Sequence, residues 1–549
     1  MATGADLLLD VLLDEGVRHV FGNPGTTELP LVDALAERSE PGYVLALQEA
    51  GAVAMADGWA RATGRPAFVN LHTMAGLANG LGNLANASAA GTPLVVTAGQ
   101  QDRRHLIAEP LLSGDLAGLA RPLVRWSHEV RHAEELGVAL RRAFRLAATP
   151  PTGPVFLSLP MDVLAQPAPA PAPPRSRVDA APLPGSLAAL ADLLAAAERP
   201  ALVCGDALAR ADGLAPAAEL AETLGAPVFA APLCSRNVFP LAHPLFRGPL
   251  PNNAAGIAET LAGFDRVLLL GAPAFYVYPY TPGSAVPPGV ELLQVHPEPA
   301  QLGRTHPVAL GVAGDPAGAA AALAEALHGR VPEERRERAI AAGREHRDAA
   351  AKKLAEQVEQ GRSGRPISPA AAVAAVCSRL PEDGVLVDES VTASPFTRAL
   401  HPGRDPLSFL WCGAGALGWG LGAAVGVKLA RPERPVVALV GDGSTMYAPQ
   451  ALWTAARHGV PVVAVVLDNR EYRILKHGLD RMEGASARTG RYVGLDVGEP
   501  DLDFVALAGS LGVAGRSVEG ADELADAVGE ALAAGEPRLV HVRISGHAR

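Results

Sequence analysis

The sequence predicts an α/β protein with three doubly wound, parallel-sheet domains. Its 549 residues are too many for one hydrophobic core and suggest about three or four domains. Short Val-rich apolar runs alternate with amphipathic stretches of helical length, as in parallel strands joined by crossover helices. A Pro-rich tract at 166–174 can neither pair in a sheet nor continue a helix, so it separates two of these domains.

These signals set the expected domain limits. The first domain is expected at 1–165, the second at 185–330 and the third at 367–549. A Pro-rich linker at 166–184 joins the first two, and a helical connector at 331–366 joins the last two. In the first domain we expect strands at 19–22, 67–71, 93–98 and 155–159, and helices at 29–38, 48–63 and, rich in Gly and Asn, 76–89. In the second we expect strands at 201–204, 228–230, 266–270 and 291–295. The connector carries a charged run at 332–361 that is typical of a solvated helix.

Composition excludes several classes of protein. The net charge of -11 argues against a nucleic-acid binder, and 49% hydrophobic with 19% charged residues is typical of a globular chain. The four cysteines lack CxxC spacing, so neither a zinc site nor a disulfide framework is indicated. The N-terminus predicts an amphipathic helix rather than a signal peptide, and no apolar run is long enough to span a membrane. We therefore expect a cytoplasmic protein.

The third domain contains one βαβ unit with polar residues at its strand ends. Apolar runs at 435–440 and 461–467 predict buried strands, and 448–458 predicts the crossover helix between them. A right-handed crossover brings the carboxyl ends of both strands to the same edge of the sheet. The first strand is followed by Asp442 and the second by Asn469, so these two side chains should face each other.

This edge has the residues of a metal and phosphate site. Mg²⁺ prefers oxygen ligands, and the side chains of Asp442 and Asn469 with the carbonyl of Glu471 would leave positions for two phosphate oxygens and a water. The backbone of Gly441 and Gly443 can approach a phosphate closely, and Ser444 opens the following helix toward it. A Gly-Asp-Gly sequence alone is more often a surface turn, but the strand context and the matching Asn favour the site.

Here the chain resembles a known family. The Gly-Asp-Gly, crossover helix and Asn-ended strand are similar to the fingerprint of enzymes that use thiamin diphosphate (ThDP), although that family usually has Asn-Asn where this chain has Asp468-Asn469. Further segments resemble the benzoylformate decarboxylases, in family order over nearly the whole chain: 21–30, 45–50, 70–72, 93–101, 121–127, 246–248, 271–273 and 451–456.

The resemblance implies an architecture and a set of partners. It implies pyrimidine-binding, central and diphosphate-binding domains, in that order. It further implies that ThDP is held by Mg²⁺, with Ca²⁺ as an alternative ion, between the first domain of one subunit and the third domain of another. The expected assembly is therefore a homodimer or homotetramer, with a small-molecule substrate and no nucleic-acid or membrane partner.

Five residues then acquire expected roles in cofactor binding. Glu49, which composition alone allows as a surface carboxylate, would bond to the pyrimidine ring of ThDP as a buried, protonated acid. Leu417, otherwise a core leucine, would hold the cofactor bent, and the Gly415 carbonyl would accept its amino group. Thr392 and Tyr472 are further candidate cofactor contacts.

Besides Glu49, which the resemblance implies is the acid that activates ThDP, three residues have expected catalytic roles. His72 ends a predicted strand and is either a structural residue or a general acid and base. Thr26 is either a helix N-cap or a ligand for the substrate carboxylate. Tyr278 stands where the family has a second catalytic histidine, and a phenol is a poor base at neutral pH. A family pocket aromatic is matched near Gly478, so the pocket differs in shape.

The predicted activity is decarboxylation of a bulky or aryl 2-oxoacid such as benzoylformate to the aldehyde and CO₂. The change at Tyr278 motivates an alternative, a carboligase that forms 2-hydroxyketones on the same scaffold. A third hypothesis is a non-catalytic nucleotide-binding protein, but the central domain has no G-x-G-x-x-G sequence.

Overall fold

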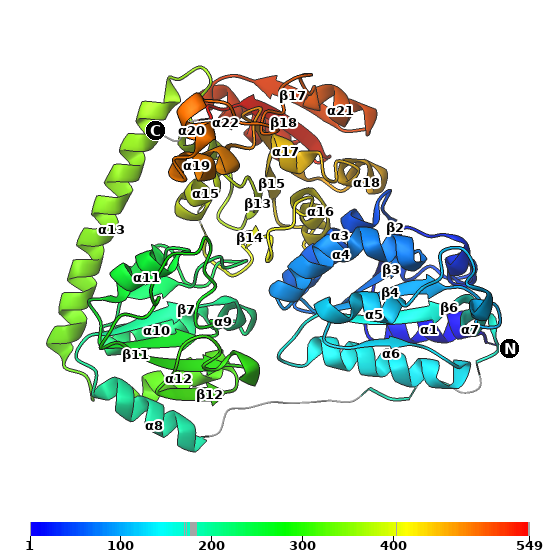
Figure 1. Cartoon of the computed structure of the whole chain (residues 1–549), viewed down its shortest axis with the longest axis horizontal. Helices are drawn as coiled ribbons and strands as arrows, with labels where there is room; N and C mark the ends of the chain where they lie inside the picture. Colours follow the sequence, from blue (N-terminus) through cyan, green and yellow to red (C-terminus); the bar gives the residue numbers. More distant parts are fainter. Residues whose placement is uncertain (1, 169–170, 172, 176–183, 402, 547–549) are drawn as a thin grey trace. The chain divides into compact units, whose positions relative to one another are not determined.

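The structure is a computed structural model that describes residues 2–168, 171, 173–175, 184–401 and 403–546 (Figure 1). It divides into two compact units. The first unit comprises Met1–Arg177, Val358–Leu400 and Cys412–Arg549, and the second comprises Val178–Gln357 and His401–Trp411. The predicted linker at 166–184 lies largely outside the described residues. Among the described residues, no helix has the length and apolar character to cross a lipid bilayer.

The N-terminal part of the first unit is a six-stranded parallel sheet of order β2-β1-β3-β4-β6-β5. Helices α3 and α4 lie on one face and α1 and α6 on the other (Figure 1). The strands are β1 (His19–Gly22), β2 (Gly42–Leu45), β3 (Ala67–Leu71), β4 (Leu94–Gln100), β5 (Ser127–Glu129) and β6 (Val155–Pro160). The helices are α1 (Gly4–Asp14), α2 (Leu29–Ala36), α3 (Glu49–Thr63), α4 (Thr73–Ala89), α5 (Leu116–Ala120), α6 (Ala133–Ala148) and α7 (Met161–Ala165), with a 3₁₀ turn η1 (Thr26–Glu28) before α2.

The C-terminal part of the first unit holds five strands of a second parallel sheet, in the order β13-β15-β16-β18-β17. Its strands are β13 (Val385–Glu389), β15 (Val436–Gly441), β16 (Val463–Asp468), β17 (Ala514–Val518) and β18 (Arg538–Arg543). Its helices are α14 (Pro369–Cys377), α15 (Ser394–Leu400), α16 (Gly420–Ala430), α17 (Asp442–Thr445), α18 (Ala451–His458), α19 (Arg473–Arg481), α20 (Ala485–Thr489), α21 (Phe504–Ser510) and α22 (Ala521–Ala533). The register sets Gly441 opposite Leu467, so β15 and β16 end side by side.

Helices α3 and α16 join the two parts of the first unit through small residues. A Cβ added at Gly58 would lie 2.1 Å from the carbonyl oxygen of Ala423, and one at Gly426 would lie 1.8 Å from that of Met55. Backbone therefore packs on backbone, and larger side chains would force the helices apart. The indole Nε1 of Trp419 also donates to Asp57 of α3 at 2.6 Å.

The second unit is another parallel sheet, of order β12-β11-β10-β7-β8-β9, around its own apolar core. The strands of this sheet are β7 (Pro200–Cys204), β8 (Val228–Ala230), β9 (Phe246–Pro249), β10 (Arg266–Leu270), β11 (Glu291–His296) and β12 (Leu310–Ala313). The unit also contains the short strand β14 (Phe409–Trp411), in which Leu410 bridges Arg236. Its helices are α8 (Pro184–Ala195), α9 (Asp206–Arg210), α10 (Leu214–Leu224), α11 (Ala254–Leu261) and α12 (Pro316–Leu327), and α13 (Glu333–Arg362) follows them.

The prediction of three doubly wound parallel-sheet domains is confirmed. Predicted elements differ from the observed ones mainly at their ends. Helix α4 begins at Thr73 rather than at 76 because the chain turns directly after His72, whose backbone is extended at φ -93° and ψ 102°. Helix α18 begins at Ala451 rather than at 448, because the short helix α17 precedes it.

Candidate active site

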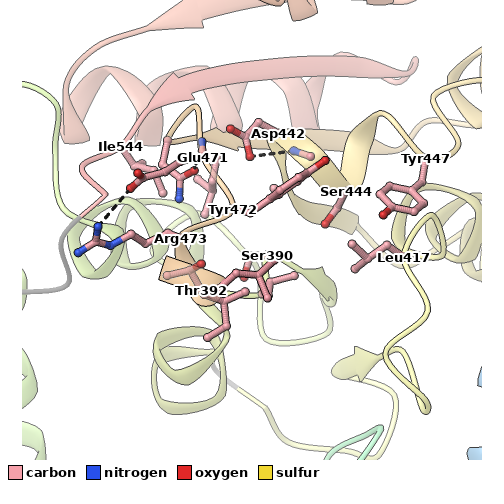
Figure 2. A pocket seen from close by; sticks show the side chains of 17 residues that line it. Ser390, Thr392, Leu417, Asp442, Ser444, Tyr447, Glu471, Tyr472, Arg473 and Ile544 are labelled. Atoms are coloured by element: carbon pink, nitrogen blue, oxygen red, sulfur yellow. Dashed lines mark hydrogen bonds and ion pairs between the residues drawn. The ribbon is translucent and has the colours of Figure 1, made fainter. Parts of the chain in front are cut away.

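A pocket opens at the carboxyl ends of β15 and β16 in the first unit (Figure 2). Figure 2 shows Leu417 and Tyr447 at one end of the pocket and Glu471 with Arg473 at the other. The predicted residues that line it are Thr392, Leu417, Gly441, Asp442, Gly443, Ser444, Asn469, Glu471 and Tyr472. The residues that the sequence did not single out are Ser390, Val391, Tyr447, Leu467, Arg473, Ile474, Leu475 and Ile544. Gly415 is not among the lining residues.

Asp442 and Asn469 lie in this one pocket, at adjacent strand ends. The Asp442 carboxylate accepts backbone N–H groups from Gly443 and Arg470, both at 2.8 Å. The Asn469 Oδ1 accepts the backbone N–H of Glu471 at 3.0 Å. Each carboxylate or amide oxygen has more than one lone pair, so these bonds orient both side chains and leave acceptor capacity toward the pocket.

The environment of Asp442 favours a bound cation. Burial and, after it, the neighbouring carboxylate of Asp468 raise its pKa to about 7. Burial also disfavours the charged form of Asp468, but hydrogen bonds, the first from His541, outweigh it and lower its pKa. His541 Nε2 and Arg543 lie 3.0 and 3.2 Å from the Asp468 carboxylate. His541 and Arg543 of β18 thus stabilise the negative charge of Asp468, whereas no cationic side chain among the described residues is bonded to Asp442.

The loop after Asn469 is fixed by pairing with a later segment. Tyr472 N–H donates to Leu495 O and Val497 N–H donates to Arg470 O, both at 2.8 Å. The side chain of Glu471 pairs with Lys476 and lies 3.7 Å from Arg473. Because that carboxylate is engaged away from Asp442, only the backbone carbonyl of Glu471 remains for the predicted metal contact.

The loop that carries Leu417 is anchored by a buried acid. Glu389 is 1% exposed, and its carboxylate accepts the N–H groups of Trp419 at 3.2 Å and Gly420 at 2.8 Å, at the start of α16. Burial raises the pKa of Glu389 to about 7. Gly415 and Gly418 have φ values of +79° and +87°, a backbone conformation that glycine adopts without strain.

A second polar cluster surrounds Glu49 in the N-terminal part of the unit. Glu49 is the first residue of α3 and is 9% exposed, so the alternative of a surface carboxylate is wrong. Its two oxygens accept from Asn23 Nδ2 at 3.3 Å and Asn79 Nδ2 at 3.0 Å. A Cβ at Gly76 would lie 3.2 Å from the Glu49 carboxylate, so the helix passes close to it.

His72 has a specific acidic partner that the sequence interpretation missed. Its Nδ1 lies 2.7 Å from Glu28 Oε2 and 3.2 Å from Thr27 Oγ1. Glu28 is 1% exposed, and the N–H groups of Gly25 and Gly99 also donate to it, each at 2.9 Å. His72 is therefore oriented by a buried carboxylate. A sequence feature could have pointed to Glu28, because it lies in the segment 21–30 that resembles the benzoylformate decarboxylases.

The prediction of Thr26 as a helix N-cap is wrong. The turn η1 begins at Thr26 itself, so its N-cap position is Gly25, whose N–H donates to the Glu28 carboxylate, and the N-cap position of α2 is Glu28. Thr26 is exposed beside Gly25, where a Cβ would lie 2.3 Å from the His72 ring. Thr26 therefore has no capping role, and its predicted contact with the substrate carboxylate stays a prediction.

The predicted residues form separate groups in one chain. All residues that line the pocket lie between 390 and 544, so Glu49, His72 and Thr26 are not among them. Tyr278 belongs to the second unit, is 72% exposed and donates its backbone N–H to Asn252 O. Its proposed contact with substrate stays a prediction.

Three family models match the chain. They are described as the N-terminal TPP binding domain, the central domain and the C-terminal TPP binding domain of thiamine pyrophosphate enzymes, at residues 2–113, 187–324 and 391–542. Thiamine pyrophosphate is another name for ThDP. The benzoylformate decarboxylase of Pseudomonas aeruginosa is 40% identical over 97% of both chains. The acetolactate synthase isozyme 3 large subunit of Escherichia coli is 29% identical over 97% of this chain and 92% of its own.

Solved structures of decarboxylases have the same fold as this chain. A ThDP-dependent 4-hydroxybenzoylformate decarboxylase from Rhodococcus jostii has a TM-score of 0.88 and 35% identity, covering 100% of both chains. Benzoylformate decarboxylase from Polynucleobacter necessarius has a TM-score of 0.87 and 33% identity, again over 100% of both chains.

The fold and the pocket therefore define an enzyme that works with ThDP. The chain belongs to the thiamine pyrophosphate enzyme family. The predictions of ThDP as cofactor, of a decarboxylase within the carbon–carbon lyases, and of a resemblance to benzoylformate decarboxylases are confirmed.

Proposed function

We propose that this enzyme removes CO₂ from a bulky or aryl 2-oxoacid of the benzoylformate type and releases the aldehyde. The observation that carries the proposal is one pocket that combines Asp442 and Asn469 with Leu417 and the apolar side chains of Ile474 and Leu475. Asp442 and Asn469 suit a diphosphate through a divalent cation that they would hold, and Leu417, Ile474 and Leu475 suit apolar groups. The similarity to two aryl 2-oxoacid decarboxylases supports the substrate class.

The residues of the pocket fit ThDP and a divalent cation. Asp442, Asn469 and the Glu471 carbonyl would hold Mg²⁺, with Ca²⁺ as the alternative, because all three offer oxygen ligands. Asp442 is a buried acid with its pKa raised to about 7, and a cation would stabilise its charged form. Gly441, Gly443, Ser444 and Thr392 surround the same space and would contact the diphosphate.

Each remaining residue has a defined task. When bound, ThDP supplies the electron sink for the bond that breaks as CO₂ leaves. Glu49 would hydrogen-bond the pyrimidine ring, Leu417 would hold the cofactor bent, and the Gly415 carbonyl and Tyr472 would add contacts. His72, oriented by Glu28, would move protons at the reacting carbon.

Two tasks concern the substrate. Thr26 would bind the substrate carboxylate through its hydroxyl, and Tyr278 would donate a hydrogen bond or proton in place of the family histidine. Because Glu49 and His72 are absent from the pocket residues of their own chain, we place the working site between two subunits of a homodimer or homotetramer.

The second candidate function is carboligation, in which the fragment left after CO₂ loss joins another carbonyl compound to give a 2-hydroxyketone. Similarity to acetolactate synthases favours it, as does the phenol of Tyr278 in place of a base.

One experiment tests both candidates. Purified protein with ThDP and Mg²⁺ is given benzoylformate and a panel of aryl and alkyl 2-oxoacids, with and without added aldehyde, and CO₂ and ketol products are measured together. CO₂ release that is fastest with aryl substrates supports the decarboxylase. Ketol formation that outpaces CO₂ release supports the ligase, and no CO₂ from any 2-oxoacid overturns the main proposal.

A further inference from the structure

A row of asparagines runs along one face of α4. Asn79, Asn83 and Asn86 are spaced four and three residues apart, so their side chains emerge on the same side of the helix. Asn83 is 1% exposed and Asn86 is 0% exposed. Buried amides are costly unless they are hydrogen-bonded, so the partners of this asparagine row indicate its purpose.

Asn86 holds the backbone of the loop 413–418, which carries Gly415 and Leu417. Its Oδ1 accepts the N–H groups of Ala414 at 3.0 Å and Ala416 at 3.2 Å. Its Nδ2 donates to Ala416 O at 2.8 Å. The loop lies outside the helices and strands, so one side chain supplies bonds that regular structure would otherwise give.

Asn83 ties the same loop to the start of α3. Its Nδ2 donates to Ala50 O at 2.8 Å and to Gly418 O at 3.3 Å. Its Oδ1 accepts from Asn86 Nδ2 at 2.9 Å, so the two amides form one network. One turn earlier, Asn79 donates to Glu49. The row therefore contacts both the expected activating acid and the expected wedge loop.

The loop approaches α4 at backbone distance. A Cβ added at Gly413 would lie 2.7 Å from Asn86 O and 2.9 Å from Ala90 N, and one at Gly82 would lie 3.7 Å from the Ala416 Cβ. Small residues on both sides leave no room for the loop to shift toward the helix. The asparagine bonds prevent movement in the opposite direction.

We infer that Asn83 and Asn86 are positioning residues that preset the loop 413–418 in the conformation that receives ThDP. The inference rests on the proposed roles of Gly415 and Leu417 in cofactor binding. Neither asparagine touches substrate in this role. A loop that is already ordered loses less conformational freedom when the cofactor binds, so the asparagines contribute to cofactor affinity.

The test compares Asn86→Ala with a matched control, Thr454→Val. Thr454 is also 0% exposed and donates one side-chain hydrogen bond, 3.0 Å long, to Leu45 O of the N-terminal part. The control therefore removes a buried bond between the same two parts of the unit without touching the loop. We expect both variants to unfold at lower temperature than the wild type.

Cofactor affinity separates positioning from a purely structural role. The dissociation constant of ThDP, measured at fixed Mg²⁺ by quenching of tryptophan fluorescence, should rise at least about ten-fold in Asn86→Ala and stay within about two-fold of wild type in Thr454→Val. Equal affinity in wild type and Asn86→Ala would overturn the inference. Binding is measured without substrate, so a wild type that binds ThDP but releases no CO₂ counts against the proposed function alone.

A second measurement uses the unmodified protein and does not depend on how a variant folds. In the cofactor-free enzyme the amides of Ala414 and Ala416 should exchange with solvent at least about 100-fold more slowly than in an unstructured peptide. Exchange of both amides at the unstructured rate would show that the loop is not preset, and would overturn the inference.

Discussion

Glu389→Gln tests how the buried acid at the start of α16 affects stability. Burial raises its pKa from 4.5 to about 7, so the folded protein binds a proton there that the unfolded chain has already released in this pH range. Stability therefore falls as pH rises from about 4.5 to about 7, and the loss is complete above pH 7. The difference between the two pKa values corresponds to about 3 kcal/mol. Glutamine does not ionise and lacks this dependence.

The assay is urea unfolding of the cofactor-free protein at pH 5, 6, 7 and 8, followed by tryptophan fluorescence. Relative to Glu389→Gln, the wild type should lose about 2.5 kcal/mol of unfolding free energy between pH 5 and pH 8, because the part of the change below pH 5 is not measured. Glu356→Gln, at an exposed glutamate of α13, is the control and should follow the wild type at each pH. If the unfolding free energy of the wild type changed with pH in parallel with that of Glu389→Gln from pH 5 to 8, the reasoning would be refuted.

Three further predictions concern the site itself. Gly25→Ala puts a Cβ 2.3 Å from the His72 ring, so we expect kcat to fall at least about ten-fold while the ThDP dissociation constant is unchanged. A fall in kcat with an equally large loss of ThDP affinity would contradict this. Glu28→Gln keeps the shape but removes the charge 2.7 Å from His72, and should lower kcat about ten- to hundred-fold and displace the pH profile of kcat; an unmoved profile would exclude Glu28 as the orienting group. Asp442→Ala, or treatment of the wild type with EDTA, should weaken ThDP binding at least about ten-fold. Added Mg²⁺ or Ca²⁺ should restore binding in the treated wild type but not in the variant. Full ThDP binding without a cation would show that no metal ion is needed.

The sequence is most informative where local pattern decides structure. Val-rich runs locate β15 and β16 to within one or two residues, and crossover handedness then brings Asp442 and Asn469 to one edge. These inferences need only short-range information and one rule of topology.

Side-chain partners from distant segments were not predictable in this way. Glu28 and His72 are 44 residues apart, and Asp468 and His541 are 73 residues apart. Their pairing depends on which strands become neighbours. Thr26 was misassigned because the helical turn already begins at Thr26, which puts Gly25 in the cap position, and Glu28 at the third position of the turn accepts the Gly25 N–H.

The ion pair between Asp468 and β18 constrains how this chain can change over evolutionary time. Replacing Asp468 by the asparagine usual in the resembled family would remove the carboxylate that His541 and Arg543 both contact, although Arg543 would keep its pair with Asp501. The single substitution Asp468→Asn should therefore be less well tolerated than the same substitution combined with a change at His541. Asp468 and His541 are therefore expected to tolerate substitution together better than singly.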